Sequence, residues 1–266
     1  MALIKGYIII TGVLALREDL NDKNIIKSTI KVFELLEVLA DNGKLNIAKL
    51  SQLTGFSKST TQRIVNTLAH LRYIQQDKST LEYFPSVKLY ELGNKVVKNM
   101  TIRNIARPHM LKLYNELNET INLGVLYDNS VIYLDKLVSK SPLKAELSLG
   151  VEVPIYCSAL GKVLAAFSDE EFSFEGSYVK YTENTIASDE ELHEELLSIR
   201  EQGYAVDNEE YVTGLVCIAV PILNRDEKAI ASMSVSIPSS RLDRNKIPEY
   251  VSVLKEYAAK IENDIY

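Results

Sequence analysis

The sequence predicts an α+β protein of two domains, and three observations lead to this class. Residues 24–86 contain three short helical patterns followed by two strand-like runs. From residue 104 onward, strand-like runs occur in blocks with helical patterns at either end, an order typical of helices packed on one antiparallel sheet. The chain of 266 residues is 46% hydrophobic and 25% charged, which is enough apolar material for two cores of ordinary size.

The first domain begins with three helical segments. Apolar residues recur at helical spacing in 25–40, and a second helix is expected over 46–53. Gly55 supplies a tight turn, after which Ser57 can cap a third helix. The inner face of this helix is expected to consist of Thr61, Ile64, Val65, Leu68 and Leu71.

A hairpin and a connecting helix follow. Residues 73–76 and 81–84 flank a polar turn and predict two short strands, so the three helices and the hairpin together form a winged helix-turn-helix. Helical spacing continues over 87–99 without a long flexible linker. The expected organisation is an N-terminal extension (1–23), a winged helix-turn-helix (24–86), a linker helix (87–103) and a second domain (104–266).

The second domain is predicted to be built around one antiparallel sheet. A tight turn at Asp128-Asn129 joins two of its strands, and residues 224–227 join the last two. Helices are expected at 105–117, 159–167, 189–202 and 244–264, and strands at 121–127, 130–137, 144–148, 204–207, 215–223 and 229–237.

Composition argues against several classes of protein. Cys157 and Cys217 are far apart in the sequence, and the three histidines are scattered, so neither a disulfide framework nor a metal site is expected. The apolar run near the N-terminus is shorter than the ~20 residues that span a bilayer, and Leu16-Arg17-Glu18-Asp19 is a poor signal cleavage site. We therefore expect a cytoplasmic protein without a membrane partner. Residues 1–23 are either an arm that packs on a partner or a mis-assigned start.

Charge is distributed unevenly along the chain. Residues 24–100 contain eleven lysines and arginines against six acidic residues, a net charge of +5. Residues 101–266 contain sixteen against twenty-seven, a net charge of −11. A basic segment joined to an acidic one indicates that only the first meets a polyanion.

The third helix carries side chains suited to reading DNA. A recognition helix presents short hydrogen-bonding groups in its first turns, because that end enters the major groove. Gln62 and Asn66 can read adenine edges and Arg63 can read guanine. Lys58, Ser59 and Thr60 suit phosphate oxygens. We therefore predict that these six residues bind double-stranded operator DNA, although an ordinary solvated helix face would look similar in isolation.

Several separate stretches resemble the IclR family of bacterial transcriptional regulators. "LNIAKLSQLTGFSKSTTQRIVNTLAHLRYI" is similar to the family's DNA-binding domain, and "YFPSVKLYELG" to its hairpin exit. The resemblance continues through "VEVPIYCSALGKVLAAFSDEE", "REQGYAVDNEEYVTGLVCIAVPI" and "AIASMSVSIPSSRL", in the family's order. It implies a GAF-like effector-binding domain after the linker helix. Thr61 departs from the family, which more often has an aliphatic residue there, so looser packing of that helix is expected.

Two features of the second domain suggest a ligand site. Ser158 can cap a helix whose first turn leaves backbone N–H groups free for a carboxylate. Ser232, Ser234 and Ser236 alternate along one strand and so share one sheet face. Lys162 either pairs with the ligand or extends to solvent.

The family resemblance implies specific effector-binding positions. They are Ala159 and Leu160, through their backbone, and the side chains of Asp207, Cys217, Ser234 and Ser236. Taken singly, Cys217 could be a core thiol and Asp207 a solvated loop carboxylate. Compatible effectors include oxo-acids such as pyruvate or glyoxylate, sugar acids such as 2-keto-3-deoxygluconate, and aromatic acids.

We therefore predict a regulator that binds a small carboxylic acid, with a repressor preferred over an activator. It should act without a cofactor as a homodimer or homotetramer. An enzyme with Cys217 or Ser158 as nucleophile is disfavoured, because no histidine lies near either in the sequence. The remaining alternative is a constitutive DNA-binding protein whose C-terminal domain only oligomerises.

Overall fold

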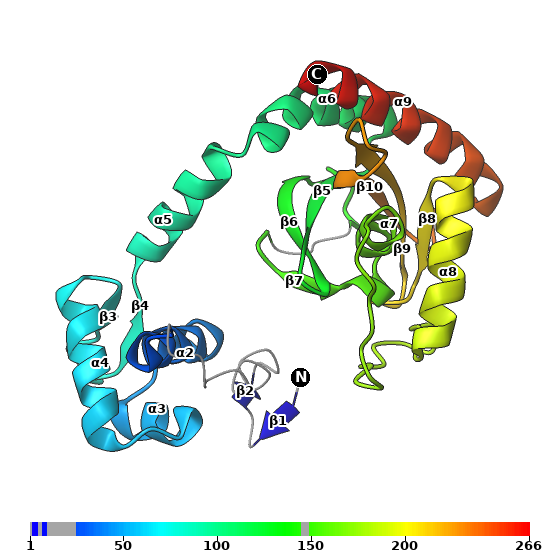
Figure 1. Ribbon diagram of the computed structural model, residues 1–266. Coiled ribbons are helices and arrows are strands. Elements are labelled where there is room, and N and C mark those ends of the chain that lie inside the picture. Colours follow the sequence, from blue (N-terminus) through cyan, green and yellow to red (C-terminus); the bar gives the residue numbers. More distant parts are fainter. Residues whose placement is uncertain (1, 5–6, 10–24, 145–148) are drawn as a thin grey trace. The chain divides into compact units, whose positions relative to one another are not determined.

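A computed structural model describes residues 2–4, 7–9, 25–144 and 149–266. The chain divides into two compact units, Met1–Val96 and Val97–Tyr266 (Figure 1). Near the N-terminus, strands β1 (Ala2–Ile4) and β2 (Tyr7–Ile9) pair antiparallel. The rest of the predicted extension and the strand expected at 144–148, except Lys144, lie outside the described residues.

The first unit has the predicted helices and hairpin. Its elements are α2 (Lys27–Asn42), α3 (Ile47–Thr54), α4 (Lys58–His70), β3 (Ile74–Gln76) and β4 (Tyr83–Pro85). Asn46 caps α3 by accepting from Lys49 N at 2.9 Å. Gly55 follows at φ 71°, a left-handed conformation that favours glycine. The turn between α3 and α4 is therefore fixed by the residue types that occupy it.

The core of this unit confirms most of the predicted inner face. Val65 is fully buried, and Ile64 and Leu68 are nearly so, together with Leu35 and Leu39 of α2. Leu71 was expected on this face but is 47% exposed, because α4 ends at His70 and Leu71 is already its C-terminal cap. Thr61 is fully buried, and its hydroxyl donates to Ser57 O at 3.1 Å. The polar group at this unusual position is thus satisfied inside the helix.

Two helices, α5 (Val87–Lys98) and α6 (Thr101–Leu117), follow the hairpin in the chain and lead to the first strand of the sheet. Helix α5 buries none of its residues. Helix α6 begins four residues earlier than predicted and continues through Pro108, which lacks the N–H of one helical hydrogen bond. Ala106, Met110 and Leu113 are fully buried on either side of Pro108, and this packing holds the helix together.

The second unit contains one antiparallel sheet, as predicted, and the described residues form six strands of it, five of which were predicted. Its spatial order is β7-β6-β5-β10-β9-β8. The strands are β5 (Thr120–Tyr127), β6 (Ser130–Leu137), β7 (Glu152–Pro154), β8 (Ala205–Asn208), β9 (Leu215–Leu223) and β10 (Ala229–Pro238). Strand β7 was not predicted, because three residues ending in proline give no recognisable period.

Helices cover both faces of this sheet (Figure 1). Helix α6 and the C-terminal α9 (Ile247–Ile265) pack on one face, and α7 (Ala159–Ala166) and α8 (Asp189–Gln202) pack on the other. Short 3-10 turns at Ile155–Cys157 and Arg244–Lys246 precede α7 and α9. No described helix is long and apolar enough to cross a membrane.

Candidate functional site

The N-terminal half of α4 presents the predicted DNA-reading side chains on its surface. Lys58, Ser59, Gln62, Arg63 and Asn66 are exposed and Thr60 is half-buried. The helix starts where expected, because Ser57 accepts from Thr60 N at 3.2 Å. Cap formation therefore sets which residues occupy the first turn.

Hydrogen bonds link several of the side chains on this surface to one another. The Ser57 hydroxyl lies 3.0 Å from Ser59 Oγ and 2.9 Å from Thr60 Oγ1. One turn later, Gln62 Nε2 donates to Asn66 Oδ1 at 2.9 Å. This bond holds the two amides side by side on the exposed face, as the spacing of four residues predicts.

The predicted effector residues come together on the α7 side of the sheet. Asp207 of β8 pairs with Cys217 of β9, which pairs with Ser236 of β10, so the three lie in one row across the sheet. Ser234 lies two positions along β10 on the same face, and Cys217 Sγ is 3.1 Å from Ser236 Oγ. These four residues and Asn122 of β5 form what we call the polar cluster. All five are at least 94% buried.

Asn122 joins this cluster from the neighbouring strand, and sequence reasoning missed it. It pairs with Ser234 across the β5–β10 ladder. Its Nδ2 donates to Ser234 Oγ at 3.1 Å and to Ser236 Oγ at 3.0 Å. A polar residue between Ile121 and Leu123 in an apolar strand is the signal that could have indicated it.

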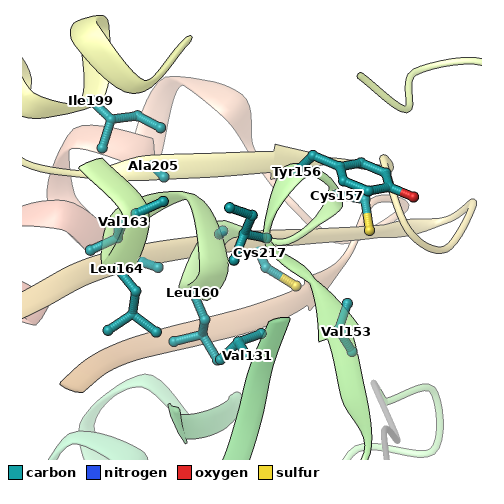
Figure 2. Close-up of a cluster of buried hydrophobic side chains, with 14 of the residues drawn as sticks. Val131, Val153, Tyr156, Cys157, Leu160, Val163, Leu164, Ile199, Ala205 and Cys217 are labelled. Atoms are coloured by element: carbon teal, nitrogen blue, oxygen red, sulfur yellow. The ribbon is translucent and has the colours of Figure 1, made fainter. Parts of the chain in front are cut away.

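The N-terminus of α7 packs directly over the sheet beside the polar cluster. Ser232 donates to Leu160 O at 3.2 Å, and Ser158 caps the helix by accepting from Gly161 N at 3.1 Å. A Cβ on Gly161 would meet Ile155 Cα at 2.6 Å, so only glycine allows this approach. Figure 2 shows Leu160 and Cys217 within the same buried cluster. The backbone N–H groups of Ala159 and Leu160 belong to the first helical turn, where no intrahelical acceptor exists.

Burial sets the protonation of the acidic group in the cluster. Asp207 is 4% exposed and accepts from Glu210 N at 2.7 Å, so it is not a solvated loop carboxylate. Burial, and then the nearby Glu210 carboxylate, raise its pKa to about 7. The same burial raises the pKa of the Cys217 thiol well above its usual value, so this cysteine stays protonated. A protonated, buried thiol is a poor nucleophile.

Tyr133 of β6 adds an aromatic wall to this region and was also not predicted. It is 5% exposed, and burial raises the pKa of its hydroxyl well above the usual value, with further contributions from Cys217 and Asp207. An irregularity in the β5–β6 pairing between Leu123 and Gly124 places Tyr133 opposite Gly124, on the α7 side of the sheet.

The Lys162 ammonium is buried and is already paired with protein groups, so it neither extends to solvent nor needs a ligand to neutralise it. Its side chain is 1% exposed, and its ammonium donates to Glu195 Oε1 at 2.9 Å, to Glu210 Oε1 at 2.8 Å and to Val206 O at 2.8 Å. Burial alone would favour the neutral amine, but Glu210 and Glu195 outweigh it and raise the pKa of Lys162. Lys162 therefore ties α7 to α8 and to the end of β8, and its charge is already neutralised.

A surface hollow near α8 is a poor alternative site for an acid. It has a volume of about 460 Å³ and is lined by Glu183, Asn184, Thr185, Ile186, Glu191, Glu194 and Glu195. Glu195 pairs with Lys162 and Glu183 with Lys180, but Glu191 and Glu194 add two further carboxylates that repel an anionic ligand.

Comparison with known proteins agrees with both halves of this description. Residues 28–78 match the IclR helix-turn-helix domain, and residues 94–263 match the bacterial transcriptional regulator IclR C-terminal domain. The chain belongs to the IclR family of bacterial transcriptional regulators. The family resemblance inferred from the sequence is thereby confirmed, together with DNA binding as the function of the chain.

Individual relatives within the IclR family extend this assignment. The HTH-type transcriptional regulator KdgR of Escherichia coli K12 is 38% identical over 240 residues, covering 89% of this chain and 91% of the relative. The DNA-binding transcriptional repressor YiaJ of the same organism is 31% identical over 248 residues, covering 90% and 88%. Both are named as regulators of transcription, in agreement with the prediction of a non-enzymatic protein.

A solved IclR homologue has the same fold with a small acid bound. The homologue from Microbacterium hydrocarbonoxydans, complexed with 4-hydroxybenzoate, superimposes with a TM-score of 0.72 at 23% identity, over 89% of this chain and 97% of that one. At this identity the likeness concerns the fold alone.

Proposed function

We propose that this IclR-family regulator is a repressor whose operator binding is controlled by a small carboxylic acid or oxo-acid. The effector would lie between the polar cluster and the first turn of α7. The observation that carries the proposal is the cluster itself, where a carboxyl, a thiol and two hydroxyls are buried together on one sheet face. Such burial costs free energy unless partners satisfy the groups, and an oxo-acid supplies the acceptor oxygens that the hydroxyls and backbone N–H groups need.

The comparisons support the same direction without naming this chain's effector. YiaJ is named as a repressor, and the Microbacterium homologue holds an aromatic carboxylic acid. In this proposal residues 24–86 bind DNA through Lys58, Ser59, Thr60, Gln62, Arg63 and Asn66, residues 87–103 connect, and residues 104–266 bind the effector. The protein acts in the cytoplasm as a homodimer or homotetramer on a palindromic operator, since closed symmetry matches paired half-sites.

The test combines a binding assay with a DNA assay. A fragment of the protein's own promoter is shifted by the purified protein at low ionic strength, and a panel of small acids is then added. An effector at a hundredfold excess over Kd stabilises the protein by ~2.7 kcal/mol, which a thermal-shift assay detects. The same acid should release the DNA.

A double variant, Ser234→Ala with Ser236→Ala, should lose the response to the acid and keep the DNA shift. Ser240→Ala, an exposed serine just beyond β10, is the matched control and should behave as wild type. If no acid in the panel changes stability or DNA binding, the constitutive DNA-binding alternative replaces this proposal.

A further inference from the structure

The three serines of β10 have different hydrogen-bond partners, although they share one sheet face. Ser232 donates to Leu160 O and so holds α7 in place. Ser234 and Ser236 instead receive hydrogen bonds from the two hydrogens of Asn122 Nδ2. The oxygens of these two hydroxyls therefore both act as acceptors for Asn122.

A serine hydroxyl that accepts one hydrogen bond still has its own hydrogen to donate. On the β9 side, Ser234 is paired with Ala219, whose side chain accepts nothing. Among the described residues, the Ser234 hydroxyl has a hydrogen bond to Asn122 and to no other group. The Ser236 hydroxyl lies 3.1 Å from the Cys217 thiol, and either group can be the donor. A thiol is at most a weak acceptor, so a ligand oxygen can take the Ser236 hydrogen in either case.

We propose that Asn122 is a specificity-determining residue of the effector site, an inference that rests on the proposed function. By donating to Ser234 and Ser236, it leaves both hydroxyls as donors. An oxo group only accepts, so it can take the hydrogens of both serines, whereas a ligand hydroxyl also brings a hydrogen of its own that needs an acceptor. The site then favours a ligand whose second functional group is an oxo group over one whose second group is a hydroxyl. Asn122 acts through the serines and need not touch the ligand, so it is a positioning residue.

Asn122→Asp reverses this arrangement with almost no change in shape. Both oxygens of the aspartate accept, so the two serine hydrogens turn towards residue 122 and the ligand meets lone pairs instead. Asn122→Leu removes the donor without adding charge and leaves each serine free to donate or accept.

The measurement is the ratio of two Kd values by isothermal titration, for pyruvate and for lactate, with glyoxylate and glycolate as a second pair. Each pair has the same charge, so the added charge of Asn122→Asp weakens both acids and cancels in the ratio. Wild type should prefer the oxo-acid by about tenfold, the value of one or two well-made hydrogen bonds. Asn122→Asp should abolish or reverse the preference, and Asn122→Leu should bring the ratio close to one.

Ser232→Ala is the control in the same strand: because its hydroxyl anchors α7 through Leu160 O, its loss should weaken both acids alike and keep the wild-type ratio. A merely structural role for Asn122 would weaken both acids and leave the ratio unchanged, and that result overturns the inference while the proposed function stands. Failure of wild type to bind any of the four acids overturns the small oxo-acid proposal and this inference with it.

Discussion

Replacing Asp207 with asparagine should change how the stability of the protein depends on pH. The carboxyl group is 4% exposed and lies near the Glu210 carboxylate, and together these raise its pKa to about 7. In the unfolded chain the pKa of an aspartate is ~3.9. The folded protein therefore holds a proton on Asp207 between about pH 4 and pH 7 that the unfolded chain has released.

The sign and size of the effect follow from this difference. A raised folded-state pKa makes a contribution to the free energy of unfolding that is complete below about pH 4 and is lost as the pH rises to about 7. Three pKa units at ~1.36 kcal/mol each give an upper value of about 4 kcal/mol. The amide of Asp207→Asn still accepts from Glu210 N and carries no titrating proton. The variant should therefore gain stability relative to wild type by up to about 4 kcal/mol between pH 4 and pH 8.

The assay is urea denaturation of the full chain by far-ultraviolet circular dichroism at half-unit pH steps, with calorimetry alongside. The Tm difference at pH 8 should be on the order of 10 °C for a unit of this size. Asp189→Asn is the sign control, because hydrogen bonds from Phe174 N, Tyr178 and Ser173 lower the pKa of Asp189. Its contribution is instead present at neutral pH and lost on acidification. Parallel pH profiles for wild type and Asp207→Asn would refute the reasoning.

Two further changes test the other interactions described above. Arg63→Ala should relax base preference at one operator position by ~1–3 kcal/mol. The assay is binding to operator fragments substituted one base pair at a time, and unchanged specificity would contradict our placement of α4 in the major groove. Lys162→Met should destabilise the protein by about 3–5 kcal/mol in urea denaturation, because Glu210 and Glu195 lose the cation that neutralises them. The control for Lys162→Met is Lys180→Met, which breaks the exposed pair Lys180–Glu183 and should have little effect on stability. Equal losses of stability in the two variants would mean that Lys162 contributes no more than a surface charge.

Features encoded within a few residues of the chain could be predicted from the sequence. The start of α4 depends on Ser57 and Thr60, three positions apart, so the cap and the exposed face with Gln62, Arg63 and Asn66 were placed correctly. The alternation of Ser232, Ser234 and Ser236 likewise predicts a shared sheet face, because successive side chains of a strand point to opposite sides.

Partners far apart in the sequence could not be predicted in this way. Lys162 was expected to reach a ligand or solvent, but its carboxylate partners lie 33 and 48 positions further along the chain. Asn122 lies 112 positions before Ser234, and their contact depends on β5 pairing with β10 in one particular register. The side-chain pattern within either strand does not specify how β5 is aligned with β10.

The β10 serines show what this limit means for reading a binding site. A strand's alternation tells which face a hydroxyl occupies, but the neighbouring strand or helix decides whether the hydroxyl donates or accepts. Leu160 O takes the hydrogen of Ser232, whereas Asn122 leaves the hydrogens of Ser234 and Ser236 to other acceptors. Three identical residues at equal spacing therefore divide into one that anchors α7 and two that, in the proposed site, would donate to an acceptor oxygen of the ligand. All three serines are on β10, so the strand that anchors the first turn of α7 through Ser232 also carries the hydroxyl donors of Ser234 and Ser236. A ligand that contacts both β10 and the first turn of α7 would therefore bind between two elements whose separation the Ser232 hydrogen bond already fixes.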